Sequence, residues 1–354
     1  MYELLQQLTR LHGPCGHEQP AARWILEYVQ NLADDVKVDS LGNIIAEKHG
    51  TSPGPSTIIT AHMDEIGFII KKIEENGLLR FEKLGGHDDR ILLAQKVQIR
   101  TKTGLLTGVI GTMSAHFVKF DDPKKVRNHQ HLYIDVGASS KKEAEDLGIR
   151  MGDPVTWKSD MEPLGNETTG KIVGKGFDDR AGCAVLLHTL EELQASSFAG
   201  TVIAIFTVQE EVGLRGAKVA AEQVEADAAI ALDTTAVSDT PEETMDNSLI
   251  LGEGTGIKIL DFSLISHPAV RESLIELAEK NKIIYQGEIF PGIGTDGGAM
   301  ALANKGIPTG VLSIPSRYAH SPVEVIDVQD LYATKDLLLA FLLAAEQDTD
   351  FSFI

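Results

Sequence analysis

The sequence has few cysteines, few aromatic residues and no long apolar run. Only Cys15 and Cys183 occur, far apart and outside any paired motif, which excludes a disulfide framework and predicts a reducing cytoplasmic setting. The segment after Met1 has no apolar signal core, and no run approaches the roughly 18 apolar residues of a membrane span. We therefore expect a cytoplasmic protein without a membrane partner.

Basic residues are also scarce. The chain has 32 Lys and Arg against 52 Asp and Glu, which gives a formal net charge of −20. Because such a charge repels phosphate groups, nucleic acid and anionic membrane surfaces are excluded as expected partners. The 354 residues exceed what one hydrophobic core usually organises, so we expect two domains.

Strand and helix patterns alternate along most of the chain. Apolar strand patterns alternate with helical patterns at residues 3–12, 19–32, 180–193, 214–223, 270–282 and 328–346. Residues 68–163 lack this pattern and instead contain short segments of alternating apolar and polar residues, separated by glycines. The sequence therefore predicts an α/β three-layer sandwich with a mixed, largely parallel sheet, built from 1–67 and 164–354. A small, mostly β inserted domain, a barrel or PDZ-like fold, is predicted at 68–163.

The stretch TIITAHMDEIG at 57–67 is predicted to end a buried strand, after a loop, SPGPS, at 52–56. His62 and Asp64 stand two positions apart, so their side chains point to the same face of a strand. An imidazole beside a carboxylate suits a metal ligand and the acceptor that orients it. It equally suits a histidine that simply hydrogen-bonds an aspartate at a strand end.

Three more predicted strands end in carboxylates, at the edge where open α/β sheets build their sites. Strands at KIVGKG, TVIAIFTV and DAAIALD are followed or ended by Asp178 and Asp179, by Glu210 and Glu211, and by Asp233. Each acid alone is explained as well by a helix cap or a solvated turn. Together they crowd negative charge in one place, and this favours a bound cation.

A second candidate imidazole, His320, follows the last predicted core strand inside the polar loop SRYAHSP. His267, in a similar strand-end loop, is its rival, whereas His188 fits a helix face. The histidines of the predicted insert fit local packing or surface contacts: His87, His116, His129 and His131.

Six motifs occur in the order AHMDEIG, GKGFDDRAG, QEEVGLRGA, ALDTT, GIGTDGGAM and SRYAHSP. This series resembles the glutamyl, deblocking and tetrahedral (TET) aminopeptidases, a family of co-catalytic metallopeptidases, over essentially the whole chain. The resemblance implies an enzyme that hydrolyses N-terminal residues from peptide substrates with two divalent metal ions per subunit. Zn²⁺ is the first expectation, and Co²⁺ or Mn²⁺ would suit the same ligands.

The resemblance also implies a role for each motif residue. The implied ligands are His62 and Asp233 on one ion, Glu211 and His320 on the other, and Asp178 between both. Glu210 would be the general base that activates a water between the metals, and Asp64 would support His62. A cis peptide bond between Asp178 and Asp179 is implied as well.

The resemblance also suggests residues for the substrate pocket and an oligomeric assembly. Through the resemblance, Thr295 and Asp296 are candidates for the pocket of the first substrate residue, although Asp296 fits a helix cap equally well. Arg317 is a candidate partner for an acidic side chain or an ordinary surface residue. Family members assemble as dimers into tetrahedral dodecamers, with contacts from the inserted domain, so a homo-oligomer is expected. The preferred N-terminal residue stays open.

Two other classes of function compete. A carbohydrate hydrolase of endoglucanase type would use a carboxylate pair such as Glu210 and another acid. That alternative leaves both histidines unexplained, and aromatic residues, which glycan grooves use heavily, make up only 6% of the chain. A non-catalytic assembly protein with the same fold would be expected to lose some ligands, yet all five are present.

Overall fold

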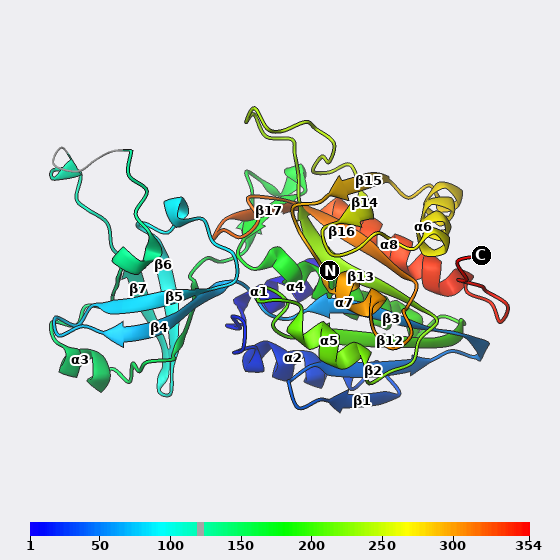
Figure 1. The fold of residues 1–354 in the computed structure, drawn as a ribbon, viewed down its shortest axis with the longest axis horizontal. Coiled ribbons are helices and arrows are strands. Elements are labelled where there is room, and N and C mark those ends of the chain that lie inside the picture. Colours follow the sequence, from blue (N-terminus) through cyan, green and yellow to red (C-terminus); the bar gives the residue numbers. More distant parts are fainter. Residues whose placement is uncertain (119–123) are drawn as a thin grey trace.

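The computed structural model describes residues 1–118 and 124–354, which form two regions side by side (Figure 1). A mixed sheet covered by helices carries both termini, and a closed six-stranded barrel projects from one end of it. The sheet uses chain segments from before and after the barrel, so the barrel is an insertion. The predicted α/β fold with an inserted β domain is confirmed, and the insert is a barrel.

Four parallel strands form the centre of the sheet. β3 pairs with β12 on one side and β13 on the other, and β13 pairs with β16. Their bounds are Ser52–His62 for β3, Ala199–Thr207 for β12, Ala228–Ala236 for β13 and Thr309–Arg317 for β16. Buried aliphatic residues dominate them, as expected for parallel strands covered on both faces.

Further strands extend the sheet at both sides. The order is β1-β2-β12-β3-β13-β16-β17-β11-β10, and β14, which pairs with β15, attaches to β16. The bounds are Asp35–Val38 (β1), Ile44–His49 (β2), Glu162–Pro163 (β10), Lys171–Gly174 (β11), Thr255–Asp261 (β14), Tyr285–Phe290 (β15) and Glu324–Asp327 (β17).

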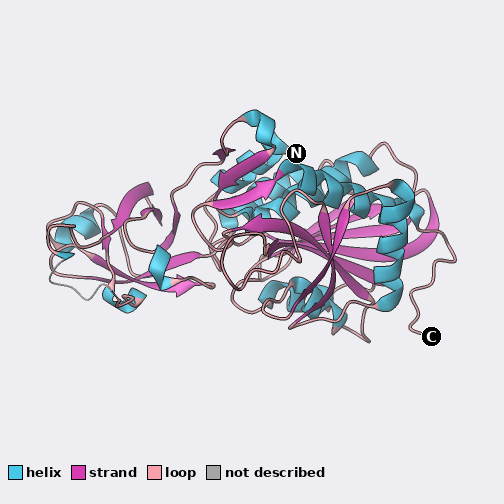
Figure 2. Ribbon diagram, turned by 90° about the horizontal axis from the view of Figure 1, so that it is seen from above, coloured by secondary structure: helices cyan, strands magenta, loops and turns pink. Residues whose placement is uncertain are grey.

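Helices cover both faces of the sheet (Figure 2). One face packs against helices α1 (Tyr2–Arg10), α2 (Gln19–Val29), α4 (Phe177–Leu193), α6 (Pro268–Asn281) and α8 (Val328–Ala344). The other face packs against the short helices α5 (Arg215–Ala221) and α7 (Asp296–Ala301). The sheet and its two helical layers therefore form the predicted three-layer sandwich.

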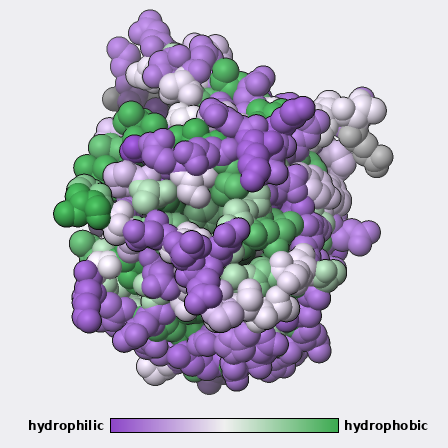
Figure 3. All heavy atoms as spheres, turned by 90° about the vertical axis from the view of Figure 1, so that its right-hand side faces the viewer, coloured by the Kyte–Doolittle hydropathy of each residue, from purple (hydrophilic) through white to green (hydrophobic). Residues whose placement is uncertain are grey.

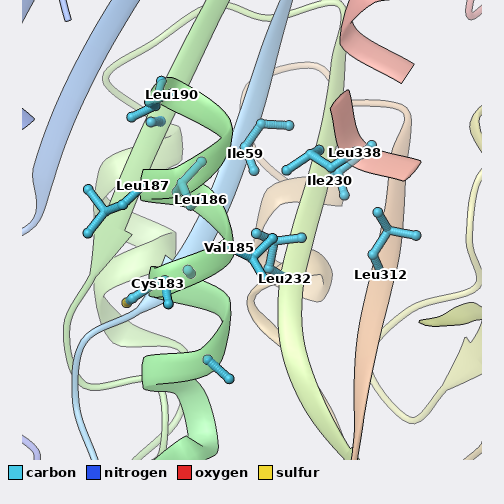
Figure 4. Packing of buried hydrophobic residues seen from close by; sticks show 14 of the residues in the cluster. Ile59, Cys183, Val185, Leu186, Leu187, Leu190, Ile230, Leu232, Leu312 and Leu338 are labelled. Carbon is cyan, nitrogen blue, oxygen red and sulfur yellow. The ribbon is translucent and has the colours of Figure 1, made fainter. Parts of the chain in front are cut away.

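Alternation along the strands assigns side chains to the two faces. Ile59 and Ile230 join the core with α4, where Val185 and Leu186 meet them (Figure 4). Their strand neighbours Ile58 and Ala229 point the other way, into the core with α5 and α7. Successive residues of a strand therefore place their hydrophobic side chains alternately in the two helical layers.

The barrel has a core of its own. Strands β4 (Gly67–Ile73), β5 (Leu79–Leu84), β6 (Lys96–Thr101), β7 (Gly104–Ile110), β8 (Ile134–Asp135) and β9 (Pro154–Trp157) close it with antiparallel pairs. Phe68, Phe81 and Trp157 are fully buried inside, with Phe68 edge-on to both partners. The short helices η1 (Asp89–Ile91), η3 (His129–His131) and α3 (Lys141–Asp146) connect the strands, and η4 (Glu167–Thr169) lies between β10 and β11.

The structure differs from expectation in three places. SPGPS at 52–56 is not a loop: it is the start of β3, where Ser52 pairs with Ala199. Strands β14 and β15 were not anticipated. Helix α4 begins at Phe177, with Asp178 and Asp179 in non-helical conformations before its regular turns.

Among the described residues, no helix is both long and apolar enough to cross a membrane. The end of the molecule that carries α6 and the C terminus exposes apolar side chains between hydrophilic ones (Figure 3). Isolated apolar residues of this kind are normal on a protein surface.

Candidate active site

The carboxyl ends of the parallel strands bring a histidine and two acids together. His62 is the last residue of β3, and Asp233 is level with it in β13, since Ala231 pairs with Thr60 two residues earlier. Nε2 of His62 lies 3.1 Å from Oδ1 of Asp178 and 3.7 Å from Oδ1 of Asp233. Sheet register therefore builds the first half of the cluster.

His320, in the loop after β16, completes the second half. Its Nε2 lies 3.2 Å from Oδ2 of Asp178 and 3.2 Å from Oε1 of Glu211. The two oxygens of Asp178 therefore face two different imidazoles. The peptide bond between Asp178 and Asp179 is cis, which confirms what the resemblance implies.

Asp64 holds the two adjacent glutamates as well as His62. Its Oδ1 accepts the backbone N–H of Glu210 at 3.0 Å, and its Oδ2 accepts that of Glu211 at 3.2 Å. Nδ1 of His62 lies 3.1 Å from the main-chain oxygen of Asp64 and 3.5 Å from Oδ1. One fully buried carboxylate thus fixes the turn that presents Glu210 and Glu211.

Buried negative charge dominates the electrostatics of the cluster. Burial raises the pKa of Glu210, and the neighbouring Asp233 adds to the rise. Burial also raises the pKa of Asp233 and of Glu211. Burial lowers the pKa of His62, but hydrogen bonds to the carboxylates outweigh it, so this pKa lies well above its ordinary value. The site therefore favours cations.

The side chains fit divalent metal ions. His62, Asp178 and Glu211 offer ligand atoms within 4.8 Å of one another, as do His62, Asp179 and Asp233. Oε1 of Glu211 is buried, and although His320 lies 3.2 Å away, no group among the described residues donates to this oxygen with hydrogen-bond geometry. Asp179 is less suited than Asp178, because both of its oxygens already accept backbone N–H groups. Imidazoles with carboxylates form a donor set for Zn²⁺, Co²⁺ or Mn²⁺.

A pocket of about 470 Å³ opens onto this cluster. The carboxylates of Asp178, Glu210, Glu211 and Asp233 line it together with His320. His62 is only 2% exposed and does not contribute to the lining formed by the described residues. A ligand in the pocket would therefore meet the acids and His320 directly.

Three other predicted site residues do not line the pocket. Thr295 is buried and caps α7, accepting the backbone N–H of Gly297. Asp296 is buried and accepts a hydrogen bond from the hydroxyl of Thr207. Arg317 donates to both oxygens of Asp239 at 2.8 and 2.7 Å. The structure therefore gives these three side chains partners within the protein.

The other histidines lie outside the cluster. His267 stands directly before α6 and makes no side-chain hydrogen bond to the helix, and its ring lies 5.6 Å from that of Phe353. His188 packs edge-on to Tyr332, between helices α4 and α8. In the barrel, His87 and His129 pack against the buried aromatic rings, while His116 and His131 are exposed. None of these imidazoles belongs to the metal-ligand groups found among the described residues.

Sequence reasoning missed Glu324. This buried carboxylate accepts the backbone N–H groups of Phe177 at 2.6 Å and Asp178 at 3.3 Å through Oε2. Its Oε1 accepts the backbone N–H of His320 at 3.0 Å. Glu324 therefore joins the two segments that carry Asp178 and His320. The acid four residues after His320 was the one available signal.

The barrel also reaches the cluster, through the glycines after β5. A Cβ on Gly86 would lie 3.2 Å from Nδ1 of His320. One on Gly85 would lie 2.6 Å from Cγ2 of Ile66 and 3.3 Å from Cβ of Glu211. These contacts are tight for a methyl group. The glycine pair at this point therefore lets the inserted barrel approach His320 and Glu211 closely.

A mixed α/β sheet with a parallel centre, whose strand ends gather two imidazoles with buried carboxylates, is the fold and site of a metallohydrolase. The family described as M42 glutamyl aminopeptidase matches residues 42–337, and the chain belongs to this family of metallo-aminopeptidases. This membership favours the peptidase over the carbohydrate hydrolase and the non-catalytic assembly protein.

Individual relatives agree over nearly the full length. The aminopeptidase APDkam598 of Desulfurococcus kamchatkensis is 42% identical with a TM-score of 0.92, covering 97% of this chain and 94% of that one. The lysyl aminopeptidase of Pyrococcus furiosus is 32% identical, over 96% of both chains. The TET1 peptidase of Pyrococcus horikoshii, which can assemble into a tetrahedron or a large octahedral shell, is 35% identical with a TM-score of 0.86. That match covers 97% of this chain and 99% of the other.

Proposed function

We propose that this aminopeptidase hydrolyses the first peptide bond of peptides at two divalent metal ions, with Zn²⁺ the expected metal. In this proposal the ligands are His62 and Asp233 for one ion, Glu211 and His320 for the other, and Asp178 for both. The observation that carries it is the position of Asp178, whose two oxygens lie 3.1 and 3.2 Å from the two imidazoles.

Glu210 is the proposed general base. When bound, the metal ions would supply Lewis acidity that lowers the pKa of water and polarises the peptide carbonyl. Glu210 takes one proton from the attacking water, whose oxygen bonds to the carbonyl carbon. As the C–N bond breaks, Glu210 returns the proton to the departing amine. Its carboxylate lines the pocket, and Asp64 holds its backbone N–H, which supports this role.

Assembly into a homo-oligomer of dimers, up to a dodecamer, is also proposed. The support is the tetrahedron formed by the TET1 peptidase of P. horikoshii. The inserted region, proposed as a domain of residues 68–163, projects from the catalytic region and could supply contacts between subunits (Figure 1). Light scattering of the purified protein would measure the number of subunits, and a monomer would contradict the proposal.

The function is tested with arylamides of single amino acids and with a cellulosic substrate, before and after chelation. We expect arylamide hydrolysis that stops on chelation and returns with Zn²⁺, Co²⁺ or Mn²⁺, and no release of sugar. Replacement of Glu210 by Gln should stop turnover without metal loss. Peptidase activity that survives both chelation and this substitution would contradict the proposed mechanism.

A further inference from the structure

The pocket lining is of two kinds. Every charged group in it belongs to the cluster at the strand ends described above. The other side chains are Leu214, Thr234, Thr235, Ala236, Phe262, Phe290, Ile293 and Ala319, all uncharged, with glycines between them. A substrate therefore meets one strongly polar group of side chains and one that is largely apolar.

Strands β14 and β15 build the apolar part. They run parallel with Asp261 paired to Phe290, so Phe262 and Phe290 leave the sheet next to each other. The backbone N–H of Phe262 donates to the main-chain oxygen of Ile293 at 3.0 Å. A Cβ on Gly294 would lie 2.5 Å from Cε1 of Phe262, and one on Gly292 would lie 3.0 Å from Cε2 of Phe290. The glycines thus let both rings lie close over the loop.

Polar groups near the apolar part are already engaged. The hydroxyl of Thr235 donates to Glu288, which forms a buried ion pair with Lys258 at 2.9 Å. Arg317 is held by both oxygens of Asp239, as described above. Among the described residues, the lining therefore offers no cation outside the cluster to an acidic substrate side chain. It also offers no acid to a basic one beyond those of the cluster.

We propose that this pocket selects peptides whose first residue has an uncharged, apolar side chain, such as Leu, Met or Phe, with Phe262 as a specificity-determining residue. The inference rests on the proposed function. The α-ammonium group of the peptide is attracted to the carboxylates, and the first side chain packs against Phe262, Phe290 and Ile293. A charged side chain there would lose water without gaining a partner.

This preference differs from the activities named for the family and for a relative. The family is described as glutamyl aminopeptidase, and the P. furiosus relative is a lysyl aminopeptidase. Those substrates carry charges of opposite sign, and each needs a complementary charge for its side chain. The pocket of this chain contains neither a free cation nor an acid outside the cluster among its described lining residues.

The first measurement is kcat/KM of the metal-loaded, full-length enzyme on Leu, Met, Phe, Ala, Glu and Lys arylamides. We expect the three apolar residues to exceed Glu and Lys by about 10-fold or more, because packing on this half-exposed apolar wall favours an apolar group and removes part of the water from an unpaired charge. A preference for Glu or Lys would overturn the inference while leaving the aminopeptidase function intact. Absence of hydrolysis for all six would instead count against the proposed function.

Charge introduced at Phe262 tests its position. Phe262 is 72% exposed, so its replacement should leave folding unchanged. We expect Phe262→Arg to raise the Glu-to-Leu ratio of kcat/KM about fivefold or more, and Phe262→Glu to raise the Lys-to-Leu ratio similarly. The matched control is Phe353→Arg, since Phe353 is 76% exposed and lines a different pocket. Equal ratios in the Phe262 variants and the control would overturn the role of Phe262.

A third variant changes shape without charge. Gly294 does not have a left-handed backbone, so in Gly294→Ala the main obstacle is the Phe262 ring, which must move. We expect a higher KM for the Leu and Phe arylamides and a smaller change for the Ala arylamide. An equal change in KM for all three would mean that the ring does not contact the first side chain.

Discussion

The two histidines of the cluster lie in opposite settings. His62 ends a central strand, is 2% exposed and takes no part in the pocket lining, whereas the side chain of His320 is 37% exposed and lines the pocket. His62 is held by sheet pairing and by Asp64. His320 lies in a loop with φ of 61°, and Glu324 holds its backbone N–H.

The difference shows how a rigid sheet and adjustable loops share one site. The buried half, at His62, is fixed by a core strand and by the buried acids Asp64 and Asp179. The open half, at His320, is held by the carboxylate of Glu324, four residues along the loop, and lies beside Gly86 of the barrel, which is distant in sequence. We therefore expect substrate access and substrate selection to belong to the open half, and five substitutions test this division.

The largest loss of activity is expected from a substitution that leaves the proposed metal ligands of both halves unchanged. Glu210→Gln keeps the shape of the side chain and removes the proton acceptor, so kcat should fall by about 100- to 10,000-fold. Both metal ions should stay bound, because Glu210 is not a proposed ligand. Turnover assays with metal analysis measure the two results, and loss of metal in this variant would give Glu210 a ligand role instead.

Replacing each histidine in turn should show how the buried half and the open half differ in metal binding and in stability. His62→Ala and His320→Ala should each lower the metal content to about one ion per subunit. In the chelated protein, His62→Ala should lower the free energy of unfolding by about 3 kcal/mol or more, because buried acids lose their partner. For the more exposed His320 about 1 kcal/mol is expected.

Urea denaturation and metal analysis measure these losses. His267→Ala is the control, since His267 lies at α6 outside the cluster. Full metal content in His320→Ala together with loss in His267→Ala would reverse the ligand assignment.

A smaller effect is expected at Glu324. Glu324→Gln removes one of the two acceptor oxygens that join Asp178 to His320, so kcat/KM or metal affinity should fall by about 10- to 100-fold. Asp330→Asn is a matched control, because Asp330 is buried and accepts two backbone N–H groups, of Gly252 and Gly254. Equal losses of activity in both variants would indicate general destabilisation.

The smallest effect is expected from the barrel. Gly86→Ala places a methyl group 3.2 Å from Nδ1 of His320, so the imidazole must shift by a few tenths of an ångström. We expect about a threefold loss of kcat/KM, with stability nearly unchanged. Gly287→Ala, where the added Cβ meets Ile259 at an ordinary 3.6 Å, is the control. Identical kinetics in Gly86→Ala and the parent enzyme would show that the barrel contact is without consequence.

The parts of the fold that follow simple periodicity were predictable. Strand β13 and helix α8 have continuous apolar patterns, and both were expected close to their observed bounds. Strands β14 and β15 were missed because Lys258 and Glu288 interrupt their apolar pattern. Only in the folded protein do these charges pair and become buried, at 0% and 3% side-chain exposure. A local pattern cannot reveal a partner some 30 residues away.

Prolines misled the prediction in a similar way. SPGPS carries the residues of a turn, yet it extends β3 at the edge of its pairing with β12, where few ladder hydrogen bonds are required. The pocket candidates show the same limit. Asp296 and Arg317 are suitable residue types, but their partners, Thr207 and Asp239, come from other elements of the fold.

The sequence alone determined the fold class, the family and which residues end the core strands, because these depend on local pattern and on motifs in order. The sequence did not determine which of these strand-end residues lie together in the folded protein. Tertiary structure alone decided that Asp178 faces both imidazoles and that Phe262 and Phe290 meet at the pocket. It also decided that Glu324 holds the backbone of His320 and that Gly86 lies beside its ring. These relations depend on strand register and loop approach across the whole sheet, which no local segment contains.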